Sequence, residues 1–393
     1  MATDAVVILG ARRTPIGAML GVFSGVAGHV LGAASIRAAL ASAGADPGIV
    51  DEVVMGCVLP AGQGQAPARQ AALGAGVPQS VPATTVNKMC GSGMRAVMYG
   101  ADQIAAGSAD FVLAGGLESM TNAPYLLPKA RAGLRMGHGE IIDHMFYDGL
   151  QSPWDGKLMG CFADSTATKY GFTRADQDVF AAESVRRAVA AVESGAFKNE
   201  IAPVTIKDRK GERVIDRDET PFTVSVDKIP SLKPAFGKDG TVTAASSSSI
   251  ADGASALLLA RASAAAKAKL KPLATIVAHA SHAHEPEWFT TAPGGAIKKA
   301  LKRAGWQAGD VDLYEINEAF AVVTMAAMKD VGIAHDRVNV HGGACALGHP
   351  IGATGARILT TLIHALQRRG KKRGLAALCI GGGEATAVAI ELS

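Results

Sequence analysis

The sequence contains few cysteines and few charged residues for its length. Its five cysteines are an odd number, are widely spaced and form no CxxC pair, which argues against a disulfide framework or a structural zinc site. Charged residues amount to 19% and the net charge is only +4, so the concentrated basic stripe of a nucleic-acid-binding protein is missing. We therefore expect a reducing, cytoplasmic setting and no nucleic-acid partner.

The sequence also lacks an apolar run of the roughly 20 residues that a membrane helix needs, so we expect no membrane association. The apolar stretch near the N-terminus is too short for a signal peptide. No P-loop occurs, and no strand-linked GxGxxG is followed by an acidic residue, which disfavours nucleotide-binding folds. Hydrophobic residues, by contrast, amount to 48%, which is typical of a well-packed globular enzyme, and 393 residues predict two or three domains.

Two segments, residues 39–56 and 300–317, resemble each other and indicate an internal duplication. Seven of their eighteen aligned positions are identical. Each segment predicts a helix that ends at Ala-Gly, then a short turn and an apolar strand. The correspondence continues downstream, because each half then has a glycine-rich turn, an amphipathic helix and a strand that runs into glycines.

Strands that alternate with helices predict an α/β fold with buried sheets, and the duplication predicts two similar halves packed face to face. Residues 119–250 are richer in charges, prolines and irregular polar stretches. We therefore expect residues 1–118, together with about 251–270, to form the N-terminal half. Residues 119–250 are then an inserted loop domain that contacts substrate and other subunits, and residues 271–393 form the C-terminal half.

Cys90 is the first candidate for chemistry. It follows the strand-like residues 83–89 and begins a Gly-Ser-Gly turn before a predicted helix. A thiol at a helix N-terminus feels the positive end of the helix dipole, which predicts a lowered pKa and a nucleophilic thiolate. A buried cysteine that serves packing alone is the alternative interpretation.

His349 and Cys379 lie in two glycine-rich features of the C-terminal half. Pro350 restricts His349 to extended conformations, which suits a side chain that must be aimed, although a hydrogen-bonded turn histidine is an alternative. Cys379 ends an apolar strand, where most cysteines are inert. The three glycines that follow it let backbone N–H groups approach a reacting oxygen, which favours a role in chemistry.

Asn317 and Glu318 follow another apolar strand, at the edge of the sheet where α/β active sites form. The alternative is that Asn317 caps a helix and Glu318 favours its first turn. His279, His282 and His284 form a histidine-rich tract, but no further ligand cluster accompanies them, and an ordinary polar loop explains them. We therefore expect no metal site.

Taken together, four motifs resemble those of the thiolase family, and the resemblance covers essentially the whole chain. They are residues 86–94 (VNKMCGSGM), 317–320 (NEAF), 348–352 (GHPIG) and 379–383 (CIGGG). Each motif alone is weak, but their combination in this order is highly specific. The resemblance implies a five-layered αβαβα thiolase fold of two duplicated halves with an inserted loop domain, assembled as a homotetramer (a dimer of dimers).

The resemblance also implies the reversible Claisen condensation of acyl-CoA by a ping-pong mechanism. Cys90 would be the nucleophile that carries the acyl group, and His349 would accept its proton. Cys379 would be the general acid and base that removes the α-proton of the incoming acetyl-CoA. One oxyanion hole would use the backbone N–H groups of Cys90 and Gly381, and the other would use His349 with a water held by Asn317. No cofactor is implied, because coenzyme A is a substrate and product.

The positions that match the acyl and CoA pocket of the family are Met159, Ser248, Phe289, Ala319 and Phe320. By resemblance, Met159-Gly160 and the loop domain favour short acyl chains, and hence two acetyl-CoA molecules condensing to acetoacetyl-CoA. Three residues depart from the commonest pattern of the family: Leu158 stands where many short-chain enzymes have His, Phe289 replaces a common Met, and Glu384 replaces Met or Gln.

Other functions stay open at this point. A thiolase that degrades longer 3-ketoacyl-CoA chains is the main alternative. A β-ketoacyl synthase is disfavoured, because Asn317 occupies the place of its first histidine and Cys379 is present. A Cys-His hydrolase and a non-catalytic scaffold that binds acyl-CoA are the remaining candidates, and the four intact catalytic positions disfavour the scaffold.

Overall fold

The structure is a computed structural model that describes residues 4–208 and 211–393. The N-terminal half contains both strands and helices. Its strands are β1 (Val6–Arg13), β2 (Gly17–Ala18), β3 (Glu52–Gly56), β4 (Ala83–Val86), β5 (Phe111–Ser119) and β10 (Ala251–Arg261). Its helices are α1 (Gly28–Ala43), α2 (Pro67–Gly74), α3 (Ser92–Ala106) and α6 (Ala262–Lys267).

The C-terminal half repeats this plan. Its strands are β11 (Ala274–Ala283), β12 (Leu313–Ile316), β13 (Arg373–Ile380) and β14 (Glu384–Leu392). Its helices are α7 (Ala292–Ala304), α8 (Ala321–Val331), α9 (Ala344–Leu347) and α10 (Thr354–Arg369). The intervening elements are β6 (Tyr125–Leu126), β7 (Ile142–Asp143), α4 (Met159–Tyr170), α5 (Arg174–Glu193), β8 (Val204–Asp208) and β9 (Gly211–Ile215).

The strands of the two halves form one mixed sheet rather than two separate ones. Its order is β12-β13-β14-β11-β1-β10-β5-β3-β4, and β2 pairs with β10. Pairing is parallel between β3 and β4, β3 and β5, and β12 and β13, and antiparallel elsewhere in this order. The halves meet where β1 pairs with β11 through two residue pairs, Val7 with Thr275 and Ile8 with Ala274.

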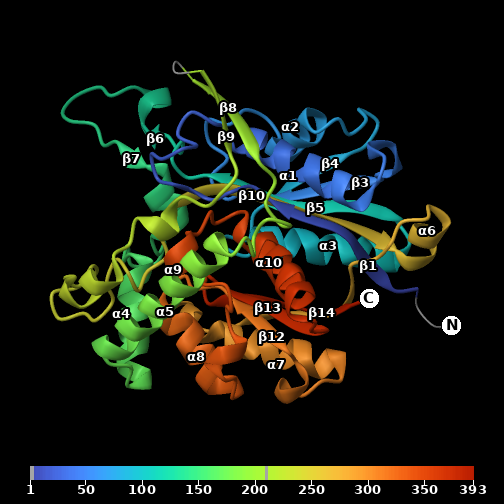
Figure 1. Cartoon of the computed structure of the whole chain (residues 1–393). Coiled ribbons are helices and arrows are strands. Elements are labelled where there is room, and N and C mark those ends of the chain that lie inside the picture. The colour runs from blue at the N-terminus through green and yellow to red at the C-terminus, as the bar shows by residue number, and fades with distance from the viewer. Residues whose placement is uncertain (1–3, 209–210) are drawn as a thin grey trace.

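The helices form three layers around the strands of the two halves (Figure 1). Helices α1 and α2 cover the outer face of the N-terminal half, and α7 and α8 cover that of the C-terminal half. Helices α3 and α10 lie between the halves and share one hydrophobic core with strands of both. This arrangement confirms the predicted αβαβα layering, and it places the starts of α3 and α10 side by side at the centre.

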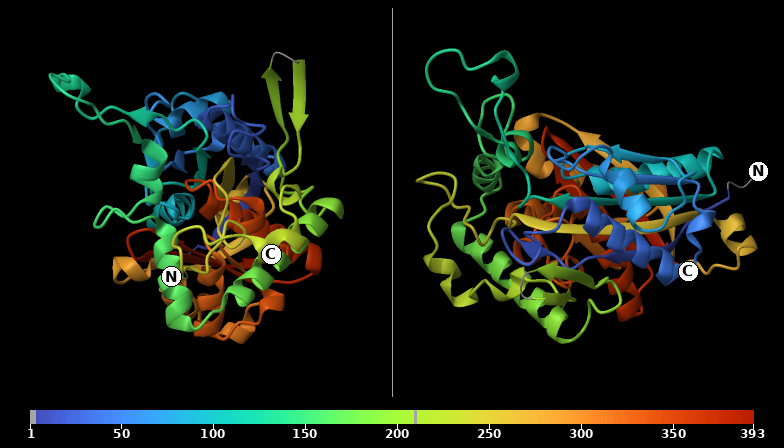
Figure 2. Two further views of the ribbon diagram at one scale, coloured as in Figure 1. Left: turned by 90° about the vertical axis from the view of Figure 1, so that its left-hand side faces the viewer. Right: turned by 90° about the horizontal axis from the view of Figure 1, so that it is seen from above.

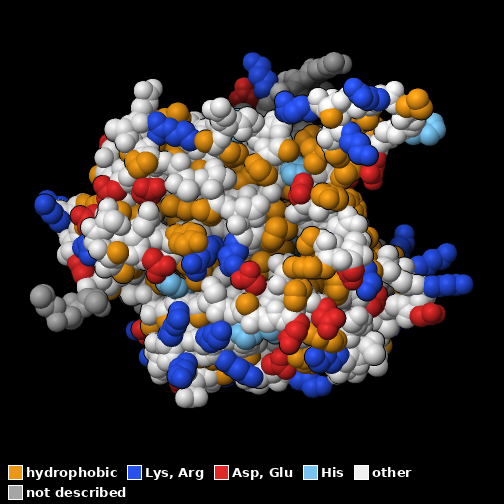
Figure 3. Space-filling view, turned by 180° about the vertical axis from the view of Figure 1, so that it is seen from behind, with side chains coloured by type: hydrophobic (Ala, Val, Ile, Leu, Met, Phe, Trp, Pro, Cys, Tyr) orange, Lys and Arg blue, Asp and Glu red, His pale blue; other side chains and the backbone are white. Residues whose placement is uncertain are grey.

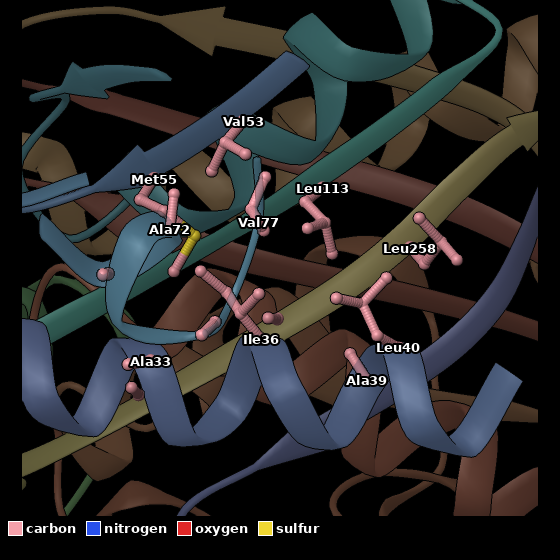
Figure 4. Packing of buried hydrophobic residues seen from close by; sticks show 14 of the residues in the cluster. Ala33, Ile36, Ala39, Leu40, Val53, Met55, Ala72, Val77, Leu113 and Leu258 are labelled. Carbon is pink, nitrogen blue, oxygen red and sulfur yellow. The ribbon is translucent and has the colours of Figure 1, made fainter. Parts of the chain in front are cut away.

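The core beneath α1 shows how the apolar periodicity is used. Ile36 and Leu40 point from α1 toward Val53, Leu113 and Leu258 on three strands (Figure 4). All five side chains are buried. Burial of such side chains stabilises the fold by about 1.5–3 kcal/mol each.

The predicted duplication is confirmed element by element. Helix α1 ends at Gly44 and α7 ends at Gly305, and both glycines adopt left-handed backbone angles, with φ of 65° and 70°. A short 3-10 turn and an apolar strand follow each helix, β3 in one half and β12 in the other. In the second half, the counterpart of β4 is reduced to a bridge between Tyr314 and Val338.

The intervening segment between β5 and β10 covers one end of the molecule. Helices α4 and α5 pack against α8, and α5 also packs against α9. The β6–β7 segment and the β8–β9 hairpin project away from the body (Figure 2). In the part of the chain that the structure describes, no helix combines the length and apolar character needed to cross a membrane.

Candidate active site

Cys90 lies in the turn between β4 and α3, one residue before the N-cap Gly91. The preceding residue, Met89, has a positive φ of 47°, which few non-glycine residues adopt. Ser92 fixes the turn, because its hydroxyl accepts a hydrogen bond from the Lys88 N–H and donates one to the Met89 carbonyl. The turn therefore presents Cys90 in a fixed position at the edge of the sheet.

The expected lowering of the Cys90 pKa by the helix dipole is wrong. Burial raises the pKa of the Cys90 thiol to about 11, although the backbone N–H groups of Gly381 and of Cys90 itself act in the opposite direction. Cys90 precedes the helix and is mostly surrounded by protein, so loss of water outweighs the dipole. The group is therefore a thiol at neutral pH, and it needs a base to become a nucleophile.

The hydrogen bonds around His349 fix the tautomer of its ring. Its Nδ1 lies 2.7 Å from Thr354 Oγ1, and the Thr354 hydroxyl donates to the Pro350 carbonyl at 2.9 Å. Because the single hydroxyl proton is used in that bond, Thr354 accepts from His349 Nδ1–H. The tautomer that results leaves Nε2 without a proton and able to accept one.

The environment of His349 keeps the imidazole neutral. Burial, and then the positive charge of Arg357, lower the pKa of His349 to about 3. Arg357 lies on α10, and its Nη1 is 3.8 Å from Glu315 Oε2, with both side chains buried. Burial raises the pKa of Glu315 to about 8. A neutral imidazole near pH 7 can accept a proton from a thiol, whereas an imidazolium cannot.

Asn317 follows β12 and faces His349. Its Nδ2 lies 3.5 Å from His349 Nε2, and its buried Oδ1 has no hydrogen-bond partner within residues 4–208 and 211–393. The helix-cap interpretation is wrong, because the N-cap residue of α8 is Phe320. Asn317 therefore offers a free carbonyl oxygen and an amide group next to the candidate base.

Glu318, the neighbour of Asn317, serves the structure and is not a first-turn acid. Its carboxylate accepts hydrogen bonds from the Ser184 hydroxyl, from Asn339 Nδ2 and from the Cys345 N–H. These bonds join α5 to the loop that leads to His349. These three hydrogen bonds satisfy the buried carboxylate.

Cys379 lies at the end of β13 and is buried. Burial, and then the proximity of Cys90, raise the pKa of Cys379 well above its usual value. The effect of Cys90 on the pKa of Cys379 shows that the two thiols lie near each other. Gly381, two residues after Cys379, directs its N–H toward Cys90.

One cavity of about 330 Å³ brings most of the predicted site together. Cys90, His349 and Gly381 line it. All five residues predicted to bind the acyl group and CoA also line it: Met159, Ser248, Phe289, Ala319 and Phe320. Cys379 lies directly behind the wall, in one hydrophobic cluster with Phe289, Ala319 and Phe320.

The histidine-rich tract lies away from this cavity, on and just after β11. His279 Nε2 lies 3.0 Å from Asp102, and His284 Nε2 bonds the Trp288 carbonyl at 2.8 Å. Within the described residues, no group of three or more His, Cys, Asp or Glu side chains is arranged to hold a metal ion.

Two residues close to the site were missed by the sequence analysis. Thr354 orients His349, and its signal was a hydroxyl residue at the start of the helix that follows the Gly-His-Pro turn. Glu118 is the next-to-last residue of β5. It accepts hydrogen bonds from the N–H groups of Val58 and Gly352, so it ties the His349 turn to the N-terminal half. Burial raises the pKa of Glu118 to about 7. The sequence feature that could have indicated Glu118 is an acidic residue near the end of an apolar strand.

Comparison with known protein families agrees with this geometry. The model "Thiolase, N-terminal domain" matches residues 6–263, and "Thiolase, C-terminal domain" matches residues 270–392. The acetyl-CoA acetyltransferase of Pseudomonas aeruginosa is 49% identical over 387 residues, or 98% of each chain. Acetyl-CoA acetyltransferase 2 of Arabidopsis thaliana is 49% identical over 390 residues, or 98% of this chain and 97% of its own.

A solved structure shares the fold over the whole chain. The crystal structure of the Bacillus anthracis acetyl-CoA acetyltransferase superposes with a TM-score of 0.97 at 41% identity, and the match covers 100% of both chains. The fold and these matches define an acyltransferase. The chain belongs to the thiolase family.

Proposed function

We propose that the protein condenses two molecules of acetyl-CoA to acetoacetyl-CoA and CoA, reversibly, as an acetyl-CoA C-acetyltransferase. The observation that carries this proposal is the single cavity lined by Cys90, His349 and Gly381, with Cys379 directly behind it. Relatives with this activity in their names match over the full chain. In the proposed reaction, two thiols and one base carry out acyl transfer and carbon–carbon bond formation.

In the first half-reaction, His349 Nε2 accepts the proton of Cys90. The thiolate attacks the thioester carbonyl of the first acetyl-CoA, and the bond between that carbonyl and the CoA sulfur breaks. The departing CoA thiolate takes the proton of Cys379. The products are acetyl-Cys90, free CoA, a Cys379 thiolate and a protonated His349. The pKa of the resting Cys379 thiol is high, so Cys379 becomes a base only in this step, when the CoA thiolate takes its proton.

In the second half-reaction, the Cys379 thiolate removes the α-proton of the second acetyl-CoA. The resulting enolate carbon attacks the carbonyl of acetyl-Cys90, and the bond to the Cys90 sulfur breaks. Cys90 then recovers its proton from His349. All three groups return to their starting protonation states, and the reverse sequence cleaves acetoacetyl-CoA with CoA.

Two sets of donors stabilise the oxyanions that form. The backbone N–H groups of Cys90 and Gly381 serve the carbonyl oxygen of acetyl-Cys90, and both already act on the Cys90 thiol. His349 serves the enolate oxygen together with a water held by Asn317, whose Oδ1 has no protein partner among the described residues. Removal of one such donor typically reduces kcat by about 10²–10³.

The lining of the cavity favours short acyl chains over the longer 3-ketoacyl chains of a degradative thiolase. Four phenylalanines line its volume of about 330 Å³: Phe146, Phe236, Phe289 and Phe320. Phe236 and Phe320 meet edge to face, with ring centroids 5.8 Å apart. Gly160 contacts the Phe236 ring so closely that a Cβ there would lie 2.2 Å from it, so the ring has little room to move.

The remaining proposals concern the substrates, assembly and organisation of the chain. CoA and acyl-CoA are the partners of the site, no cofactor takes part, and the enzyme acts in the cytoplasm as a homotetramer. Residues 119–250 form the loop domain between an N-terminal half (residues 1–118 and about 251–270) and a C-terminal half (residues 271–393). The pairing of β10 with β1 and β5 supports assigning β10 to the N-terminal half.

The test is thiolysis of acetoacetyl-CoA by free CoA, followed as loss of enolate absorbance with formation of two acetyl-CoA. Cys90→Ala is expected to abolish turnover and keep CoA binding, because it removes the nucleophile. Cys379→Ala is expected to lower the rate of condensation by roughly 10³-fold or more, because it removes the acid and base. Cys345→Ala removes a buried thiol outside the cavity and is the matched control. Net hydrolysis without acetyl-CoA formation, or condensation by Cys90→Ala, contradicts the proposal.

The same assay across chain lengths tests the preferred substrate. We expect kcat/KM to fall steadily from acetoacetyl-CoA to 3-ketodecanoyl-CoA, because four phenylalanines line a cavity of only about 330 Å³. A maximum at a long chain identifies the alternative, a degradative 3-ketoacyl-CoA thiolase.

A further inference from the structure

The loops that carry Cys90 and Gly381 come from different halves of the chain, and an ion pair ties them together. Lys88 Nζ lies 2.5 Å from Glu384 Oε2. Lys88 stands two residues before Cys90, and Glu384 stands three residues after Gly381. The two side chains are 25% and 35% exposed, so the pair is partly shielded from water. Shielding strengthens the attraction relative to that of a freely exposed pair.

Each partner is anchored to a rigid element. The Lys88 N–H donates to Ser92 Oγ at 2.8 Å, and the Lys88 carbonyl accepts from the Gly91 N–H at 3.0 Å, so Lys88 is fixed to the start of α3. Glu384 is the first residue of β14 and pairs with Ile380 at the end of β13. A contact between Lys88 and Glu384 therefore fixes α3 relative to the β13–β14 turn.

The β14 side of the β13–β14 turn is also held by β11, because the Gly383 carbonyl accepts a hydrogen bond from the His284 N–H at 2.9 Å and Glu384 pairs with Ala283. Gly382 and Gly383 separate Gly381 from Glu384, and both have positive φ angles, 95° and 86°. Residues without side chains gain the most conformational freedom when a restraint is lost. The Cys90 loop also touches β13 where Gly91 packs on Ile380: a Cβ on Gly91 would lie 2.4 Å from the Ile380 side chain.

We propose that Lys88 and Glu384 are positioning residues that hold the Gly381 N–H at the Cys90 thiol. Neither residue lines the catalytic cavity, so neither touches the reacting atoms. The expected effect on kcat rests on the proposed function, in which that N–H stabilises the oxyanion on Cys90. The position of the N–H at the thiol does not rest on it, because the Gly381 N–H already acts on the resting Cys90 thiol.

Two single variants separate position from charge. Lys88→Met removes a positive charge and Glu384→Gln removes a negative one, so a purely Coulombic effect on Cys90 shifts its reactivity in opposite directions. Positioning predicts the same direction for both. We expect each variant to lower kcat for acetoacetyl-CoA thiolysis about tenfold, with KM within twofold, and to slow iodoacetamide alkylation of Cys90, read by mass spectrometry of its peptide.

Two further variants complete the design. The exchange Lys88→Glu with Glu384→Lys restores the pair in reverse, and we expect it to recover at least half of the lost kcat and alkylation rate. Glu391→Gln is the matched control, because Glu391 lies at the other end of β14 and pairs with Arg373 at 3.1 Å. Its kcat is expected to stay within twofold of wild type.

The outcomes distinguish this inference from the proposed function. Three results would each overturn the positioning role. The first is a shift of the alkylation rate in opposite directions in the two single variants, the second is rates within twofold of wild type in both, and the third is an exchange variant that recovers no activity. Absence of thiolysis in the wild type refutes the proposed function. The positioning role is still supported if Cys90 alkylation slows in both single variants and recovers in the exchange variant.

Discussion

At the scale of single residues, the chemistry of His349 depends on a hydroxyl that the motif does not contain. The Gly-His-Pro turn aims the ring, but Thr354 sets which nitrogen carries the proton. This division matters because burial has already removed the charge from the ring and lowered its pKa to about 3. The tautomer then decides whether Nε2 can accept a proton.

Replacing Thr354 tests this dependence. In Thr354→Val the buried Nδ1–H loses its acceptor, which costs about 1–3 kcal/mol, and we expect kcat to fall roughly ten- to a hundredfold. Thr354→Ser keeps the hydroxyl and is expected to stay within threefold of wild type. Thr360→Val removes another buried hydroxyl of α10, one bonded to Ser255 at 3.0 Å, and controls for general damage to the helix. Equal loss in Thr360→Val and Thr354→Val contradicts the proposed role.

The residue scale also shows what the sequence could predict. Residue type and position predict Cys90, Asn317 and Cys379 at or after strand ends and His349 in a Gly-His-Pro turn, and the structure puts them there. The pKa of Cys90 was predicted in the wrong direction, because a dipole argument uses local sequence, whereas desolvation depends on all that packs around the thiol. Partners distant in sequence, such as Lys88 and Glu384, leave no local pattern at all.

At the scale of elements, the site depends on how closely α3 and α10 approach at their N-terminal ends. A Cβ at Gly355 would lie 2.4 Å from the Met94 nitrogen, and one at Gly93 would lie 2.9 Å from the Gly352 carbonyl oxygen. Glycine is needed here for close approach of two backbones. The apolar periodicity predicted both helices, but the contact between them could not be read from either helix alone.

Gly355→Ala tests the approach of the two helices. The added methyl group must push α10 from α3, and we expect a loss of about 1–3 kcal/mol in the free energy of unfolding, together with reduced kcat as His349 moves away from Cys90. Denaturant unfolding and thiolysis rates measure the two effects. Gly309→Ala is the control, because a Cβ at Gly309 meets nothing within 4 Å. Stability equal to that of the control would show that the helices tolerate the added methyl group.

At the scale of the whole molecule, the duplication places complementary groups on either side of one seam. The N-terminal half supplies Cys90, and the C-terminal half supplies His349, Asn317 and Cys379. The seam is held by the core between α3 and α10 and by the short pairing of β1 with β11. The repeat predicted two halves, but their joining into one hydrogen-bonded sheet depends on two residue pairs that carry no sequence signal.

The segment between β6 and β7 projects from this body and exposes apolar side chains. It stands clear of the rest of the molecule in both views of Figure 2, and Figure 3 shows hydrophobic side chains among Lys and Arg on it. Met136 is 96% exposed. The other exposed large hydrophobic residues of this segment are Tyr125, Leu127, Leu134 and Ile141. Apolar side chains gathered on a projection favour contact with another subunit.

Shortening this segment tests the proposed assembly. Leu126 and Ile142 are directly paired, so Asn-Gly in place of residues 127–141 closes a two-residue hairpin and leaves the body unchanged. Light scattering is expected to give the wild type about four times the 40.1 kDa of one chain and to give the shortened variant half of that mass. Met136→Glu is expected to weaken the tetramer in the same direction, because a charge on an apolar contact surface must lose water when the subunits meet. A shortened variant that stays tetrameric assigns the contact to another surface.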